Sequence, residues 1–345
     1  MPTPDENKAF LTDLFCGEFR GHAFAVTPPG IPSVPGDFTV GSGTVAERAD
    51  LAEREYERWV RFQEAVGDDG VPYAITHTGT GIFANAFGCR IAEFEGSNPA
   101  AMPMLTTPAE ADALRDPEIE ATALGQHLEL IEELVRRLGP ETPIGGADMQ
   151  SPLGIAAVVW EKAAFFEAML ETPDAVHGLI DRCCRLLERY LSAQRDLSPS
   201  LSPIHCPTVW GPKELGCSVS EDEVGAISRA MYEEFGLPQL IRLSERFGGI
   251  YIHCCAAADH QYEAFKKIPN LRGLNRNFQE PGALPCLRAF GDRTVHSIGW
   301  PQMDRVREFL DYDVPNVRYL FSYSASSMDD AKRAYETFRG WCERQ

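Results

Sequence analysis

Short apolar runs alternate with longer amphipathic segments along most of this chain. The runs are rich in β-branched and aromatic residues and end in polar residues, as buried strands often do. We predict strands at residues 72–77, 143–150, 203–210, 250–252, 271–275, 294–298 and 317–323. The amphipathic segments carry the period of helices, and we predict helices within residues 45–64, 108–138, 155–197 and 228–247.

A strand followed by a helix, repeated in this way, predicts a parallel sheet with helical crossovers. The sequence lacks the glycine fingerprint of a dinucleotide-binding domain, and so many strands in one chain favour a closed ring over an open sheet. The expected fold class is therefore α/β, a (β/α)8 or TIM barrel formed as a single domain by residues 46–345. Residues 1–45 are rich in proline and glycine, so we expect an irregular N-terminal arm there.

The carboxyl ends of the strands form one rim of such a barrel, and active sites of this fold lie at that rim. The polar residues that end the predicted strands are therefore expected to face a common cavity. Those that we expect to bind substrate are His77, Asp148, Gln150, His205, Asn275, His296 and Tyr323. For His296, the alternative is a buried core histidine.

The strand end at His253 and Cys255 is where the sequence concentrates its chemistry. A two-residue step in an extended chain puts both side chains on the same face, and imidazole and thiolate are ligands that zinc prefers. This pair predicts half of a metal site. Two alternatives stay open, because cysteines at a strand end are often packing residues, and His253 with Asp259 or His260 could perform acid–base catalysis without a metal.

Glu221 and Asp222 follow Ser220 directly. They could supply a carboxylate to the rim, but a serine followed by acidic residues is also an ordinary helix start, and we favour that interpretation.

The composition narrows the classes of partner. The formal net charge is −19, from 32 basic and 51 acidic residues, and such a surface repels nucleic acids and anionic lipids. The chain begins with a polar stretch instead of a signal-peptide pattern, and no apolar run reaches the length of a membrane span. With ten cysteines in a chain of this size, we expect reduced thiols and a cytoplasmic protein.

Four segments carry a family resemblance, namely Gly79–Gly88, Gln150–Leu153, Ser228–Pro238 and His253–Cys255. They resemble parts of the uroporphyrinogen decarboxylase superfamily, and the resemblance runs through most of residues 70–330. This superfamily also contains zinc-dependent methyltransferases that move a methyl group from a corrinoid protein to a thiol such as coenzyme M. The resemblance implies a (β/α)8 barrel with its site at the carboxyl-end mouth.

The methyltransferase branch is the nearer of the two. The decarboxylase branch grips the propionates of a tetrapyrrole with an arginine-rich segment, but residues 73–78 of this chain contain no arginine. The methyltransferase branch is similar at His253 and Cys255, which the resemblance implies are zinc ligands. Its third ligand is a cysteine after the last strand, where residues 321–327 of this chain offer serines. Cys206 is the expected replacement, with His205, Cys217 and His260 as alternatives.

The leading hypothesis is thus a methyltransferase-like enzyme that uses zinc at the barrel mouth to move a methyl group between a corrinoid protein and a small thiol. The corrinoid would be supplied by a partner protein, and the resemblance suggests a homodimer. Two alternatives are a metal-free decarboxylase of a small carboxylic acid, which is a lyase, and a catalytically silent barrel that binds a ligand.

Overall fold

The structure is a computed structural model that describes residues 2–19, 21–31, 40–95, 97–278 and 280–342. Its main sheet contains six parallel strands, and their bounds follow the order in the sheet. They are β1 (His22–Thr27), β10 (Arg318–Ser324), β9 (Val295–Gly299), β8 (Leu271–Arg276), β7 (Ile250–Cys254) and β6 (Cys217–Ser220).

Shorter pairings continue the sheet from β6 back to β1. Strands β4 (Ile144–Gly145) and β5 (Leu201–Ser202) pair in parallel. Single parallel bridges join Gln150 to Ser220 and Ala74 to Ile144. The backbone N–H of Asp69 then donates to the carbonyl oxygen of Phe24 in β1, at 3.2 Å. These links complete the ring, and the α/β barrel predicted from the sequence is confirmed.

Two predicted strands are short or displaced in the structure. Residues 72–77 form only the bridge at Ala74, and residues 203–210 follow β5 without joining a strand. Prolines explain the difference, because Pro72, Pro203 and Pro207 have no N–H to donate to a ladder.

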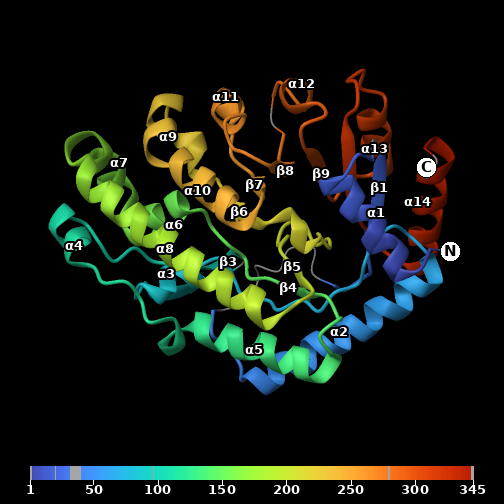
Figure 1. The fold of residues 1–345 in the computed structure, drawn as a ribbon, viewed down its shortest axis with the longest axis horizontal. Helices are drawn as coiled ribbons and strands as arrows, with labels where there is room; N and C mark the ends of the chain where they lie inside the picture. The colour runs from blue at the N-terminus through green and yellow to red at the C-terminus, as the bar shows by residue number, and fades with distance from the viewer. Residues whose placement is uncertain (1, 20, 32–39, 96, 279, 343–345) are drawn as a thin grey trace.

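The helices lie outside the sheet (Figure 1). Helices α2 and α5 run along one side, α6 to α8 along the next, and α9 to α13 along the third, while α14 lies against β1. Their bounds are α2 (Val45–Val66), α3 (Ile82–Ala86), α4 (Pro108–Ala113), α5 (Ala123–Leu138), α6 (Pro152–Val159), α7 (Lys162–Glu171), α8 (Pro173–Leu197), α9 (Arg229–Phe235), α10 (Leu237–Phe247), α11 (Tyr262–Phe265), α12 (Leu284–Phe290), α13 (Met303–Leu310) and α14 (Met328–Trp341). An antiparallel pair, β2 (Ile91–Phe94) and β3 (Ser97–Ala101), forms a separate hairpin.

The prediction of an irregular arm over residues 1–45 is wrong for most of the described part of that segment. Residues Pro4–Cys16 form helix α1, which starts with a capping box between Thr3 and Glu6. Phe15 of α1 packs into the same buried cluster as Tyr251 and Leu320. Because β1 is also a strand of the main sheet, the barrel domain includes this segment. The proline-rich residues 32–39 lie outside the described part of the chain.

The two faces of the main sheet bury different residues. In β7, Ile250, Ile252 and Cys254 belong to the cluster that packs under α8 and α10, whereas Tyr251 belongs to the cluster inside the ring. Side chains on a strand alternate between faces, so His253 follows Tyr251 and points inward. This alternation determines which residues at the strand ends can meet.

No helix in the described part of the chain is long and apolar enough to cross a membrane.

Candidate metal centre

Strands β6 and β7 bring together the side chains of the candidate centre. Ser220 of β6 is paired with His253 of β7, and the backbone N–H of Glu221 donates to the carbonyl oxygen of His253 at 2.8 Å. This pairing extends the ladder by one residue, so that Asp222 leaves β6 beside the point where Cys255 leaves β7. The backbone N–H of Cys255 donates to Asp222 Oδ1 at 2.6 Å.

Asp222, His253 and Cys255 each offer one ligand atom, and these three atoms all lie within 4.8 Å of one another. No other group of three histidine, cysteine or acidic side chains in the described residues meets this condition. Asp222 and His253 are half-buried, and Cys255 is exposed. One side of the group is therefore open to an incoming molecule.

The ring of His253 is held in one orientation by Asn275 on β8. His253 Nδ1 lies 2.6 Å from Asn275 Oδ1, and Asn275 Nδ2 donates to the carbonyl oxygen of Ser297 at 2.6 Å. Because Asn275 uses its N–H group on Ser297, its oxygen faces His253 and accepts the proton on Nδ1. Nε2 of His253 is then the unprotonated nitrogen, which is the form that binds a metal.

The charges around Cys255 favour a cation. Burial raises the pKa of its thiol to about 12, and the negative charge of Asp222 contributes further. A divalent cation bound between the two groups would reverse this balance, because it stabilises both the thiolate and the carboxylate. The donor set of one imidazole, one thiol and one carboxylate, with an open side, fits a catalytic zinc site.

Arg276, the last residue of β8, fixes the loop that carries Cys255. It is 6% exposed. Its Nη1 atom donates to the carbonyl oxygens of Cys254 and Ala256, at 3.1 and 2.6 Å, and to the sulfur of Cys254 at 3.0 Å. The two carbonyl groups flank Cys255, so the guanidinium determines where that residue lies relative to His253.

A second polar group lies beside the centre, inside the ring. His205 is bonded at both nitrogens, with Nε2 2.9 Å from Ser220 Oγ and Nδ1 3.1 Å from Ser218 Oγ. Its Nε2 atom is also 3.6 Å from Asp148 Oδ1, and Gln150 Nε2 donates to the same oxygen at 3.4 Å. The rings of His205 and His253 lie 6.5 Å apart between their centroids.

Burial determines the protonation of this polar group. It lowers the pKa of His205 to about 3, with a smaller contribution from His253, so that the ring is neutral at neutral pH. Burial raises the pKa of Asp148 to about 6, which the charge of His253 partly opposes. Asp148 therefore keeps most of its negative charge at pH 7.

The structure gathers about half of the predicted site residues. Asp148, Gln150, His205 and Asn275 lie around His253 and Cys255, although Asn275 contacts His253 from behind and orients its ring. The other members of the prediction lie elsewhere.

The predicted catalytic partners of His253 face away from it. Asp259 accepts a hydrogen bond from the Tyr262 hydroxyl and lies 3.6 Å from Arg276 Nη2. His260 Nε2 lies 2.9 Å from the carbonyl oxygen of Ile227 and is committed to that loop. The prediction that Asp259 and His260 act with His253 is wrong, because the chain turns away from the rim after Ala256.

Three predicted substrate-binding residues point out of the ring. His296 is fully buried beside Tyr319, on the face of β9 that packs against helices. Tyr323 donates its hydroxyl to Asp330 of α14, at 3.1 Å to the nearer oxygen. His77, at the end of its segment, places Nε2 2.7 Å from Glu55 Oε2 on α2. The strand ends were predicted correctly, but the face of each strand was not.

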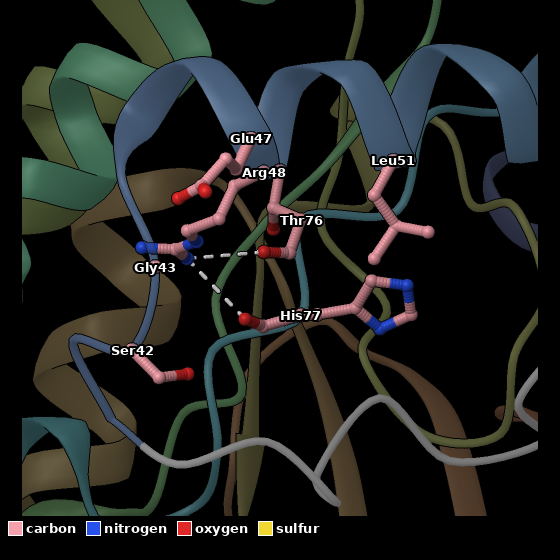
Figure 2. Close-up of a pocket in the computed structure, with 7 residues that line it drawn as sticks. All are labelled: Ser42, Gly43, Glu47, Arg48, Leu51, Thr76 and His77. Carbon is pink, nitrogen blue, oxygen red and sulfur yellow. Dashed lines mark hydrogen bonds between the residues drawn. The ribbon is translucent and has the colours of Figure 1, made fainter.

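A separate cavity of about 180 Å³ lies beside His77, between α2 and the segment that contains Thr76 (Figure 2). Arg48 of α2 donates from Nη2 to the carbonyl oxygens of Thr76 and His77, at 3.2 and 3.3 Å. The imidazole of His77 lies on the Leu51 side, away from the guanidinium. This cavity is outside the ring and does not contain the residues of the candidate metal centre.

Cys206, the expected third ligand, is replaced in the group by Asp222. Cys206 is buried, and desolvation raises the pKa of its thiol strongly, with Asp148 and Asp222 adding to the effect. It lies near the centre but is not one of the three atoms within 4.8 Å of one another.

Two functional residues escaped the sequence reasoning. Asp222 was considered for the rim but interpreted as a helix start, and it does precede a short 3-10 helix, Glu223–Ala226. The signal for its second role was the alternation of the unpredicted strand β6, where Val219 faces the helices and Ser218 and Ser220 face the ring. Arg276 had no signal in the sequence, because its role depends on carbonyl groups of the neighbouring strand.

The fold and the centre together define a class, a closed parallel barrel with a three-residue metal-ligand group at the carboxyl ends of its strands. Residues 70–201 match the family model described as Uroporphyrinogen decarboxylase (URO-D). This match confirms the resemblance to the uroporphyrinogen decarboxylase superfamily over that part of the chain.

A methyltransferase from Methanosarcina mazei has a similar structure, with a TM-score of 0.64 over 96% of this chain and 98% of that chain. The sequence identity is 14%, so this similarity establishes the fold. No curated protein sequence matches this chain significantly.

Proposed function

We propose that this protein is a metal-dependent methyltransferase that moves a methyl group between a corrinoid protein and a small thiol. The observation that carries the proposal is the group formed by Asp222, His253 and Cys255, whose ligand atoms lie within 4.8 Å of one another. The resemblance to the methyltransferase branch and the similar fold of the methyltransferase from Methanosarcina mazei support it.

The residues of the chain divide the work in this proposal. Asp222, His253 and Cys255 hold a zinc ion, Asn275 keeps His253 in the tautomer with a free Nε2 atom, and Arg276 fixes the backbone on both sides of Cys255. When bound, zinc would supply Lewis-acid chemistry that makes a substrate thiol a good nucleophile near neutral pH. The exposed side of Cys255 leaves room for that thiol and for the corrinoid partner.

The first experiment measures zinc and activity together. The protein is purified with zinc and without it, and zinc content is compared for wild type, Asp222→Asn, His253→Ala and Cys255→Ser, with Cys206→Ser as the matched control. We expect one zinc per wild-type chain, loss of zinc in the first three variants, and retention in Cys206→Ser. Demethylation of free methylcobalamin in the presence of 2-mercaptoethanol, followed by its absorbance, should show the same order.

The result that overturns the proposal is a wild-type protein that binds no zinc, or one whose zinc is unaffected by all three substitutions. Carbon dioxide release from a small carboxylic acid that persists in the presence of a chelator would instead favour the metal-free decarboxylase.

A further inference from the structure

The charges that surround the candidate metal centre are mostly negative. Asp222 belongs to the centre itself, and Asp148 lies beside it at 3.6 Å from His205. Glu221 is fully buried, and burial raises the pKa of its carboxyl group to about 8, so it contributes little charge at neutral pH. Asp148 is thus the acidic group next to the centre that is ionised and does not serve as a ligand.

The cation closest in sequence and structure to Cys255 is not available to a substrate. Arg276 is buried, and Nη1 already donates to the carbonyl oxygens of Cys254 and Ala256. Its Nη2 atom faces Asp259 at 3.6 Å. The guanidinium therefore serves the protein backbone and cannot grip an anionic group of a ligand.

Other basic side chains do not compensate for Asp148. In the described residues, the charges that act on Asp148 come from His253 and Asp222, and no lysine or arginine acts on it or on His205. Arg305, in the neighbouring groove beyond Trp300, pairs with Glu308 and lies over the ring of Phe309. Outside the described residues the chain has only two basic residues, Arg20 and Arg344.

The sum of charges then favours one kind of acceptor. A zinc ion carries two positive charges, which Asp222 and the Cys255 thiolate balance, while the ligand His253 is neutral. Asp148 remains with its negative charge, and a substrate thiolate adds a second one. An anionic group at the far end of the substrate would be repelled, whereas an ammonium group would be attracted.

We infer that the thiol accepted at this centre is cationic or uncharged at its far end, and that Asp148 attracts a substrate ammonium group. This inference rests on the proposed function, because it concerns the acceptor of that same site. It sets the protein apart from a site built for thiols that carry a sulfonate or a carboxylate.

The test compares three thiols of similar length, namely 2-aminoethanethiol, 2-mercaptoethanol and 3-mercaptopropionate. Each is titrated into the zinc-loaded protein by calorimetry and into the cobalt(II)-loaded protein by thiolate-to-cobalt absorption, neither of which needs a methyl donor. We expect the aminothiol to bind about tenfold more tightly than 3-mercaptopropionate, with 2-mercaptoethanol between them.

Two variants identify the cause of the order. Asp148→Asn should reduce the preference for the aminothiol to less than about threefold. Glu167→Gln, an exposed change on α7 that alters the net charge equally, should leave the preference unchanged. A tighter complex with 3-mercaptopropionate, or an unchanged preference in Asp148→Asn, overturns the inference alone. Failure of all three thiols to bind overturns the proposed function as well.

Discussion

Arg276→Met tests whether the loop that carries Cys255 is held in place by the guanidinium. The substitution removes two hydrogen bonds from a charged donor to carbonyl oxygens, at 3.1 and 2.6 Å. Such bonds contribute about 1.5–3 kcal/mol each, and the desolvation of the guanidinium offsets part of this. We expect the free energy of unfolding to fall by about 3 kcal/mol.

The effect on zinc binding follows from the position of the two carbonyl groups. They flank Cys255, so their release allows that ligand to move relative to His253 and Asp222. Changes behind the ligands of a metal typically weaken its binding by about 10- to 100-fold, and we expect a loss in that range.

Urea unfolding and zinc competition titrations measure the two effects. The matched control is Arg272→Met on the same strand, where the guanidinium donates to the exposed carbonyl oxygen of Gly248 at 3.3 Å. This change should cost less than about 1 kcal/mol and leave zinc affinity unchanged. The reasoning is refuted if Arg276→Met unfolds at lower urea but binds zinc as tightly as wild type.

Three further predictions concern residues outside the centre. Burial, with a contribution from Arg318, lowers the pKa of His296 to about 3, so the unfolded chain takes up a proton below about pH 6.5 that the folded protein refuses, and stability falls with pH by up to about 1.4 kcal/mol per unit. His296→Leu should flatten this fall in urea unfolding between pH 6 and 4, and equal slopes would contradict it. Tyr323→Phe loses the bond to Asp330 and should cost about 1 kcal/mol without changing zinc affinity, whereas weaker zinc binding would return Tyr323 to the site. Phe15→Ala empties a position that is 2% exposed and should cost about 3–5 kcal/mol in thermal unfolding, while a loss below 1 kcal/mol would show that α1 is not part of the core.

The barrel could be predicted because strands and helices alternate strongly in the second half of the chain. The predicted strands at 250–252, 271–275, 294–298 and 317–323 correspond to β7, β8, β9 and β10. The first half was harder, because its ring segments are held by single bridges and side-chain contacts that have no periodic signal. Strand β1 was hidden in a segment that proline and glycine marked as irregular.

The candidate site was predicted in part for a related reason. Polar residues at strand ends were found, but the side of the sheet that each one faces depends on register, and a shift of one residue exchanges the two faces. His253 and Cys255 were placed correctly because they lie two residues apart on one strand. His77, His296 and Tyr323 lie on other strands, whose register the sequence does not determine.

The third ligand decides the central claim, and X-ray absorption at the zinc edge of the zinc-loaded protein identifies it most directly. With Asp222, His253 and Cys255 as ligands, the spectrum should show one sulfur at about 2.3 Å and the remaining neighbours as nitrogen or oxygen at about 2.0–2.2 Å. Asp222→Asn should weaken the bound zinc while the single sulfur remains. Two sulfur neighbours in the wild-type spectrum, or no ordered zinc at all, would contradict the account.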